Sequence, residues 1–92
     1  MNVPVRHDSS ATRFAASVDG RLCVAEYSLA DGVMSMTHTY VPPPLEGRGI
    51  AAALVAAALA HARAAGLRVR PVCSYVARYM QRHPDTLDLL CD

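Results

Sequence analysis

The sequence contains no lysine and no tryptophan, and only one phenylalanine among its 92 residues. Without lysine, the chain has no side chain of the usual kind for forming a Schiff base with a carbonyl substrate, which excludes that class of covalent catalysis. The basic residues are nine arginines that form no continuous basic run, and the net charge is only +1. A nucleic-acid partner is therefore not expected, because a phosphate backbone is bound by clustered cationic side chains.

Long hydrophobic runs and cysteine pairs are also missing. No uncharged apolar run reaches the ~18 residues that a membrane-spanning helix needs, so no membrane partner is expected. Cys23, Cys73 and Cys91 are odd in number and form no C-x-x-C pair, and the N-terminus has no hydrophobic signal core. These features predict a reduced, cytoplasmic protein. The histidines show no short spacing, which predicts no metal site, and His7 and His61 are expected at solvated surface positions.

The composition is that of a small folded domain. Hydrophobic residues make up 52% of the sequence and charged residues 18%, which is far from the composition of disordered chains. A chain of this length is expected to form a single domain over residues 1–92. Many of the apolar residues are alanines concentrated between positions 51 and 65, so the core is expected to contain few bulky side chains.

The first 41 residues predict antiparallel strands joined by tight turns. Asp19-Gly20 and Asp31-Gly32 are typical of two-residue hairpin turns. The expected strands cover residues 3–6, 12–18, 21–29 and 33–41, with a further turn at 7–10. The three prolines at 42–44 end the last strand because proline has no N–H group to donate to a neighbouring strand.

The second half of the sequence predicts a β-α-β unit and a final helix. Residues 47–65 have a helical stripe of apolar side chains, and Gly66 follows at the position of a left-handed C-terminal cap. A strand over 67–72 is expected to lie parallel to strand 33–41 through a right-handed crossover. Ser74 is expected to cap a helix over 74–82, and residues 85–92 are expected to add one turn. The fold class is thus α/β (α+β), with antiparallel strands, a β-α-β unit and a C-terminal helix.

The turn into the long helix carries the strongest chemical signal. It reads PLEGRGIA from position 44 to 51, and its two glycines allow a ligand to approach the backbone closely. The first N–H groups of a helix have no internal partner and lie at the positive end of the helix dipole, which predicts an anion-binding site. Neither G-x-x-x-x-G-K-[ST] nor the dinucleotide pattern G-x-G-x-x-G is present, so those two phosphate loops are excluded.

Residues 41–54, VPPPLEGRGIAAAL, resemble the acyl-CoA-binding segment of GNAT-type N-acetyltransferases, which reads R/Q-x-x-G-x-G/A and opens a helix after a strand. Glu46 stands in the R/Q position, Gly49 supplies the glycine and Ala51 takes the last small position. The segments MTHTYVPP and VRPVCSYVARYMQRHPD extend the resemblance to a very small GNAT-like subfamily over nearly the whole chain. The resemblance implies a minimal GNAT-like fold without the N-terminal helices of larger acetyltransferases.

The resemblance also implies a cofactor site for acetyl-CoA or coenzyme A, used as a co-substrate without a metal. Backbone N–H groups are expected to hold the diphosphate, while Arg48 offsets the negative charge of Glu46. Thr39 and Val41 are expected to bond the pantetheine amides where the two parallel strands diverge. The expected cofactor-binding residues are Thr39, Val41, Glu46, Gly47, Arg48, Gly49, Ile50 and Ala51.

Four side chains are candidates for the chemistry that the resemblance implies. His38 could act as the general base, since histidine titrates near neutrality, or it could fix the strand end by hydrogen bonding. Cys73 precedes a helix N-terminus, which lowers a thiol pKa, and is the candidate nucleophile of the subfamily; the alternative is a small buried apolar side chain. Tyr75 and Tyr79 lie one helical turn apart, and either could protonate the CoA sulfur or simply pack.

Two functions from different classes stay open. The first is transfer of an acetyl group from acetyl-CoA to an amine, directly or through Cys73. The second is a CoA-binding or protein-interaction module with little catalysis, which the missing glutamate base and the carboxylate of Glu46 favour. A third reading is a structural β-α-β domain whose glycine loop binds nothing. The acceptor is not specified by the sequence, but a shallow acceptor face would favour an amine on a peptide or protein.

Overall fold

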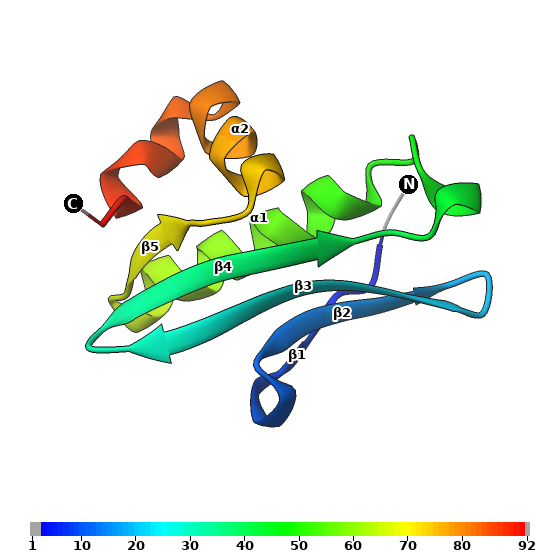
Figure 1. The fold of residues 1–92 in the computed structure, drawn as a ribbon, viewed down its shortest axis with the longest axis horizontal. Coiled ribbons are helices and arrows are strands. Elements are labelled where there is room, and N and C mark those ends of the chain that lie inside the picture. The colour runs from blue at the N-terminus through cyan, green and yellow to red at the C-terminus, as the bar shows by residue number, and fades with distance from the viewer. Residues whose placement is uncertain (1–2, 92) are drawn as a thin grey trace.

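The structure is a computed structural model that describes residues 3–91 (Figure 1). Its sheet contains five strands in the order β1-β2-β3-β4-β5. The strands are β1 (Arg6–Asp8), β2 (Arg13–Val18), β3 (Arg21–Ala30), β4 (Val33–Tyr40) and β5 (Arg68–Pro71). The helices are α1 (Ile50–Ala65) and α2 (Ser74–Arg82), with short 3-10 helices η1 (Ser9–Ala11), η2 (Pro43–Leu45) and η3 (Pro84–Leu89).

The predicted topology is confirmed. Strands β1 to β4 form an antiparallel meander, and β5 pairs with β4 in parallel after the crossover through α1. Both hairpin turns lie at the predicted dipeptides, where Asp19 and Asp31 each have φ of 52°. Their glycines follow at φ of 73° and 75°, which is the geometry of a turn that matches the twist of the strands.

The first strand differs from its prediction. The expected strand at residues 3–6 is wrong, because β1 comprises Arg6–Asp8 and the turn comes after it. Asp8 determines where the turn begins: its carboxylate accepts the Ser10 hydroxyl at 3.0 Å and the Ala11 N–H at 3.3 Å. His7 is consequently paired with Phe14 in the sheet and is not part of the turn.

Smaller differences occur at the element boundaries of the second half. Helix α1 starts at Ile50 and not at residue 47, because Gly47 and Gly49 have φ of 82° and 79°, outside the helical region. Cys73, and not Ser74, is the N-cap of α2. The turn predicted for 85–92 is the 3-10 helix η3, and Asp92 lies outside the described residues.

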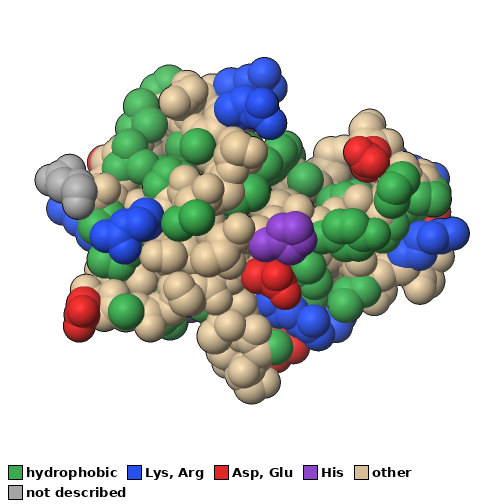
Figure 2. Space-filling view, in the orientation of Figure 1, with side chains coloured by type: hydrophobic (Ala, Val, Ile, Leu, Met, Phe, Trp, Pro, Cys, Tyr) green, Lys and Arg blue, Asp and Glu red, His purple; other side chains and the backbone are tan. Residues whose placement is uncertain are grey.

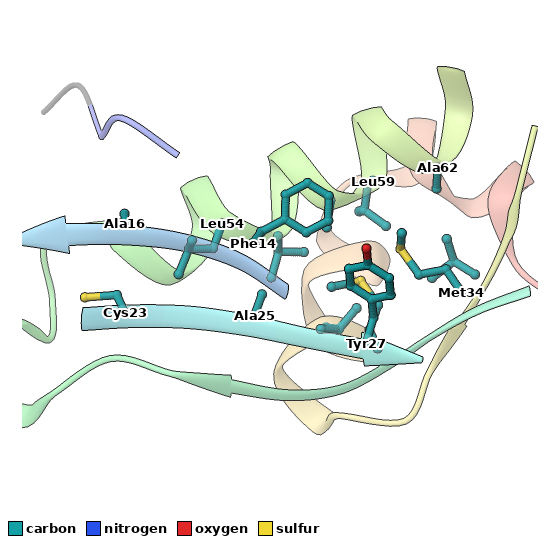
Figure 3. Close-up of a cluster of buried hydrophobic side chains, with 14 of the residues drawn as sticks. Phe14, Ala16, Cys23, Ala25, Tyr27, Met34, Leu54, Leu59 and Ala62 are labelled. Carbon is teal, nitrogen blue, oxygen red and sulfur yellow. The ribbon is translucent and has the colours of Figure 1, made fainter. Parts of the chain in front are cut away.

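Both helices contribute to one hydrophobic core on a single face of the sheet. In Figure 3, side chains of β2 and β3 point toward α1, where Leu54, Leu59 and Ala62 meet them. Helix α2 adds Val76 and Met80 to the same core. Along the described chain, no helix covers the opposite face of β3 and β4, which is turned toward the viewer in Figure 1. None of the helices within residues 3–91 has the length and hydrophobicity needed to cross a membrane.

A bulge in β4 decides which side chains point to which face. Tyr27 pairs with Met36, but Glu26 pairs with His38, so Thr37 is an extra residue in β4. Met36 is fully buried beneath the helices. A regular strand would place residue 38 on that same face, because side chains alternate. The bulge instead turns Thr39 toward the core and His38 toward the uncovered face.

His7 and His61 do not stand apart on the surface as expected. The His7 ring stacks on Phe14 with ring centroids 4.2 Å apart, and its centroid lies 4.4 Å from that of His61. A hydrogen bond of 2.5 Å joins His7 Nε2 to the hydroxyl of Tyr27. These contacts tie β1 to β2, β3 and α1.

Candidate functional site

A cleft of about 510 Å³ lies between the end of β4, the 3-10 helix η2 and the first turns of α1 and α2. It contains all the residues that the sequence predicts for cofactor binding except Arg48, and Tyr75 is the one lining residue from outside the segment 39–52. Its lining residues are Thr39, Tyr40, Val41, Pro43, Leu45, Glu46, Gly47, Gly49, Ile50, Ala51, Ala52 and Tyr75.

One wall of the cleft is an unpaired stretch of strand edge. The parallel pairing of β4 with β5 ends at Met36 and Pro71, and the Cys73 N–H then donates to the Met36 carbonyl at 2.9 Å. Beyond this point β5 gives way to α2, so residues 37–40 have no strand partner on that side within the described chain. Backbone groups at such an edge can bond the amides of an extended ligand.

The other wall is the start of α1. Gly49 is the N-cap, and its carbonyl accepts the Ala53 N–H at 3.1 Å. No heavy atom lies within 4 Å of the place where a Cβ on Gly49 would stand, so the space in front of the helix start is open. Because Ile50 and Ala51 also line the cleft, the free N–H groups and the positive end of the helix dipole are close to this space.

The charged side chains of the loop are not arranged as expected. Glu46 lines the cleft, but Arg48 does not, and its guanidinium donates to the Asp19 carboxylate of the β2–β3 hairpin at 2.9 Å. Arg48 is therefore engaged with Asp19, and the structure does not bring it next to Glu46 to offset that charge. The helix start remains the source of positive potential in the cleft.

Cys73 lies beside the unpaired edge of β4. Its thiol donates to the Thr39 hydroxyl across a distance of 3.7 Å. Burial on its own would raise the pKa of the Cys73 thiol, but the N–H groups of Val76 and Tyr75 and the hydroxyl of Thr39 stabilise the thiolate. The net effect is a lowered pKa, as expected for a thiol at a helix N-terminus. Cys23, buried in the core, has a pKa raised by burial.

His38 and Cys73 lie next to the cleft on different faces of the sheet, and neither is among its lining residues. His38 is opposite Glu26 on the uncovered face, whereas Thr39, the partner of Cys73, is opposite Ala25 on the core side. The His38 side chain is exposed, and its ring is nearly parallel to that of Tyr40, with centroids 6.4 Å apart. The two candidate residues therefore flank the edge of β4 and do not contact each other as a pair.

The two tyrosines of α2 line one hollow on that helix, but only Tyr75 also lines the cleft. Tyr75 lines the cleft, and its burial raises the pKa of the phenol, so it carries its proton at neutral pH. Tyr79 lies one turn further along α2, in a hollow against α1, with its ring stacked on His83 at a centroid distance of 3.9 Å. Of the two, Tyr75 is the one placed to reach a ligand in the cleft.

Sequence reasoning missed several lining residues. Tyr40, Pro43, Leu45 and Ala52 complete the walls of the cleft. The proline run was interpreted only as the end of a strand, but it also forms η2, whose Leu45 is almost fully buried and anchors the loop. No cluster of three or more metal-ligating side chains is found among residues 3–91.

Comparison with known proteins identifies the same family as the sequence motifs. Residues 13–89 match the family model described as GCN5-related N-acetyl-transferase. Protein NATD1 of Gallus gallus is 29% identical over 86 residues, which covers 89% of this chain and 77% of that protein. Protein NATD1 of Xenopus tropicalis is 28% identical over 87 residues, with coverage of 90% and 79%.

A solved structure supports the fold. The solution structure of a GCN5-like protein from Staphylococcus aureus matches with a TM-score of 0.76 and covers 98% of this chain and 89% of its own. At 22% identity this likeness concerns the fold alone. The family match, in contrast, covers most of the sequence, including the loop and helix start that form the cleft. The chain therefore belongs to the GCN5-related N-acetyl-transferase family, a family of acyl-CoA-dependent acetyl transfer.

Proposed function

We propose that this chain binds acetyl-CoA in the cleft at the start of α1 and transfers the acetyl group to a primary amine. The observation that carries the proposal is that one cleft holds both an open helix start and an unpaired strand edge. The helix start suits a diphosphate, and the strand edge suits the amides of pantetheine. These are two chemically distinct parts of coenzyme A.

The binding mode follows from the two walls. The diphosphate would accept hydrogen bonds from the N–H groups around Gly49 and Ile50. The pantetheine arm would run along residues 37–41 of the β4 edge, which brings the thioester toward Thr39 and the Cys73 thiol. Glu46 is the one carboxylate in the lining, and it would have to turn toward solvent when the diphosphate enters.

The reaction needs one bond formed and one broken. The amine nitrogen attacks the thioester carbon, the new C–N bond forms and the C–S bond breaks. The phenol of Tyr75, which lines the cleft and is protonated, would give its proton to the CoA sulfur, and the proton lost by the nitrogen would restore the phenol. A two-step route also fits, in which the Cys73 thiolate first accepts the acetyl group and then passes it to the amine.

The test begins with calorimetric titration of the purified protein with acetyl-CoA and with CoA. Mass spectrometry after mixing with acetyl-CoA then shows whether Cys73 carries an acetyl group, with Cys73→Ser as the matched variant. Acetylation of an added amine by Cys73→Ser at the wild-type rate would establish direct transfer. Absence of binding to either ligand at millimolar concentration would overturn the proposal.

Glu46 supports a second candidate function. Glu46 stands where the family pattern carries Arg or Gln, and it lines the cleft proposed for the diphosphate. A chain with this feature could serve as a CoA-binding or interaction module with little turnover. Tight binding of CoA without acetylation of any amine in a broad panel, including peptides, would favour this function. The cytoplasmic location predicted from the cysteine usage fits both functions and is tested by localising a tagged chain.

A further inference from the structure

The uncovered face of the sheet carries a row of charged side chains across four strands. The register pairs Asp8 with Arg13, Arg13 with Glu26, and Glu26 with His38. Residues directly opposite each other in antiparallel strands point to the same face, with Cβ atoms ~5 Å apart. Figure 2 shows a histidine, an acidic and a basic side chain in succession on this face. We call these four residues the cross-strand row.

Within the row, Glu26 is left available for a ligand. The Asp8 carboxylate lies 3.5 Å from Arg13 Nε, so the arginine has an acidic partner on its other side. Among residues 3–91 the Glu26 carboxylate forms no hydrogen bond or ion pair, and only its backbone carbonyl is bonded, by the Thr37 hydroxyl at 3.3 Å. Glu26 is half-buried, so a cation binding there would compensate for the lost solvation of the carboxylate.

The His38 end of the row lies at the cleft. The bulge at Thr37 turns His38 to the uncovered face, and the next residue, Thr39, both lines the cleft and contacts the Cys73 thiol. Tyr40, which shares the face of His38, also lines the cleft. The row therefore ends where the thioester is expected.

An apolar surface lies directly beside the two residues at this end. The neighbouring register position pairs Val24 with Tyr40, but Val24 is buried and offers little surface to a ligand. Tyr40 and Leu22 on this surface are 47% and 41% exposed. A ligand with an ammonium group and a hydrophobic body would match both the carboxylate and the apolar surface.

We propose that the acceptor amine reaches the thioester from this uncovered face. Glu26 binds its ammonium group, the apolar body rests on the exposed side chains of Tyr40 and Leu22, and His38 takes the proton that must leave before the nitrogen can attack. The neutral amine then forms the C–N bond as the C–S bond breaks, and its second proton leaves with the CoA sulfur. The role of His38 rests on the acetyl transfer proposed above, whereas the ammonium site can be tested without it.

The test uses 2-phenylethylamine as the probe and 2-phenylethanol, which lacks the charge, as its neutral counterpart. Amide chemical shifts of the isotope-labelled protein are followed by NMR during titration with each probe. The key variant is Glu26→Gln, which keeps the shape of the side chain and removes its charge. Asp31→Asn is the matched control, since it removes a carboxylate from the turn at the far end of β3 and asparagine tolerates the positive φ there.

We expect the amine to shift the amides around Glu26, His38 and Tyr40, and the alcohol to shift them only weakly. Glu26→Gln should weaken amine binding at least about tenfold, while Asp31→Asn binds as the wild type does. Shifts confined to the α1 and α2 side, absence of amine binding, or equal affinity in the two variants would overturn the inference. Failure of acetyl-CoA to bind in the calorimetric titration would overturn the proposed function and leave the ammonium site standing.

Discussion

Replacement of Gly49 by alanine separates the binding role of this residue from its structural role. Gly49 and Gly66 are the two caps of α1, with φ of 79° and 70°. A Cβ at either position meets no heavy atom within 4 Å, so neither substitution creates a clash. Both force alanine into the left-handed region, at a cost of about 1–2 kcal/mol. Gly66→Ala is therefore the matched control for Gly49→Ala.

Both variants are expected to remain folded. A chain of 92 residues is expected to unfold with a free energy of about 5–14 kcal/mol, so a loss of 1–2 kcal/mol leaves nearly all molecules native. Each variant should lower Tm by roughly 4–16 °C. Only Gly49→Ala adds a methyl group in the open space before the helix start, where it would displace a diphosphate from the backbone N–H groups.

Loss of one charge-assisted hydrogen bond costs about 1.5–3 kcal/mol, so Gly49→Ala should bind acetyl-CoA about 10- to 150-fold more weakly. Calorimetry at a temperature well below both Tm values measures the affinity, and thermal unfolding measures the stability. The reasoning is refuted if Gly49→Ala and Gly66→Ala, with similar Tm values, bind acetyl-CoA equally well. It is also refuted if Gly66→Ala shows the larger loss of affinity.

Three further predictions concern the titratable and charged groups. Because the pKa of its thiol is lowered, Cys73 should react with iodoacetamide at pH 7 faster than a thiol in a short model peptide does. Mass spectrometry follows the reaction, and buried Cys23 should stay unmodified. Slower reaction of Cys73 than of the peptide would contradict this prediction. Burial, and to a lesser extent repulsion from a neighbouring histidine, lowers the pKa of His7 in the folded protein. Because the unfolded chain then binds a proton more readily, the free energy of unfolding should fall as the pH drops below about 6.5. The urea midpoint, measured between pH 8 and 5, should fall less steeply for His7→Asn than for the wild type. Arg63 donates to both carboxylate oxygens of Asp88 at 2.8 and 2.9 Å, but both side chains are exposed. Arg63→Ala should therefore lower Tm only slightly, and less at high salt than at low salt. A large decrease in Tm that does not depend on salt would show that the contact stabilises the fold through packing.

Local patterns in the sequence are sufficient to predict most of the fold. The dipeptides Asp19-Gly20 and Asp31-Gly32 fixed two turns, and with them the register of the three strands that they join. Helix α1 can be predicted because its signals are local: the apolar stripe lies within the helix and Gly66 follows directly after it. These features depend on residues that are near one another in the chain.

The errors arise where distant residues decide the outcome. The sequence predicts a turn at His7, but its ring lies in a cluster with Phe14 and Tyr27, which local sequence cannot reveal. The bulge at Thr37 was not predicted either, since it depends on how β3 and β4 pair. That bulge decides the face of His38, so the sequence identified the residue but not its surroundings. The position of Glu26 opposite His38 depends on the same pairing and could not be predicted either.

The order of the strands in the sheet has a consequence for how the protein folds. Strands β1 to β4 each pair with the next strand in sequence, and these contacts close short loops. Only the pairing of β4 with β5, in which Val33 meets Arg68, must wait for the whole of α1 to be placed. Closing longer loops costs more entropy, so we expect the meander to form early and the junction of β4, β5 and α2 to form late. The cleft at the start of α1 is assembled at that late step, so acetyl-CoA, if it binds there as proposed, should slow unfolding much more than it speeds refolding.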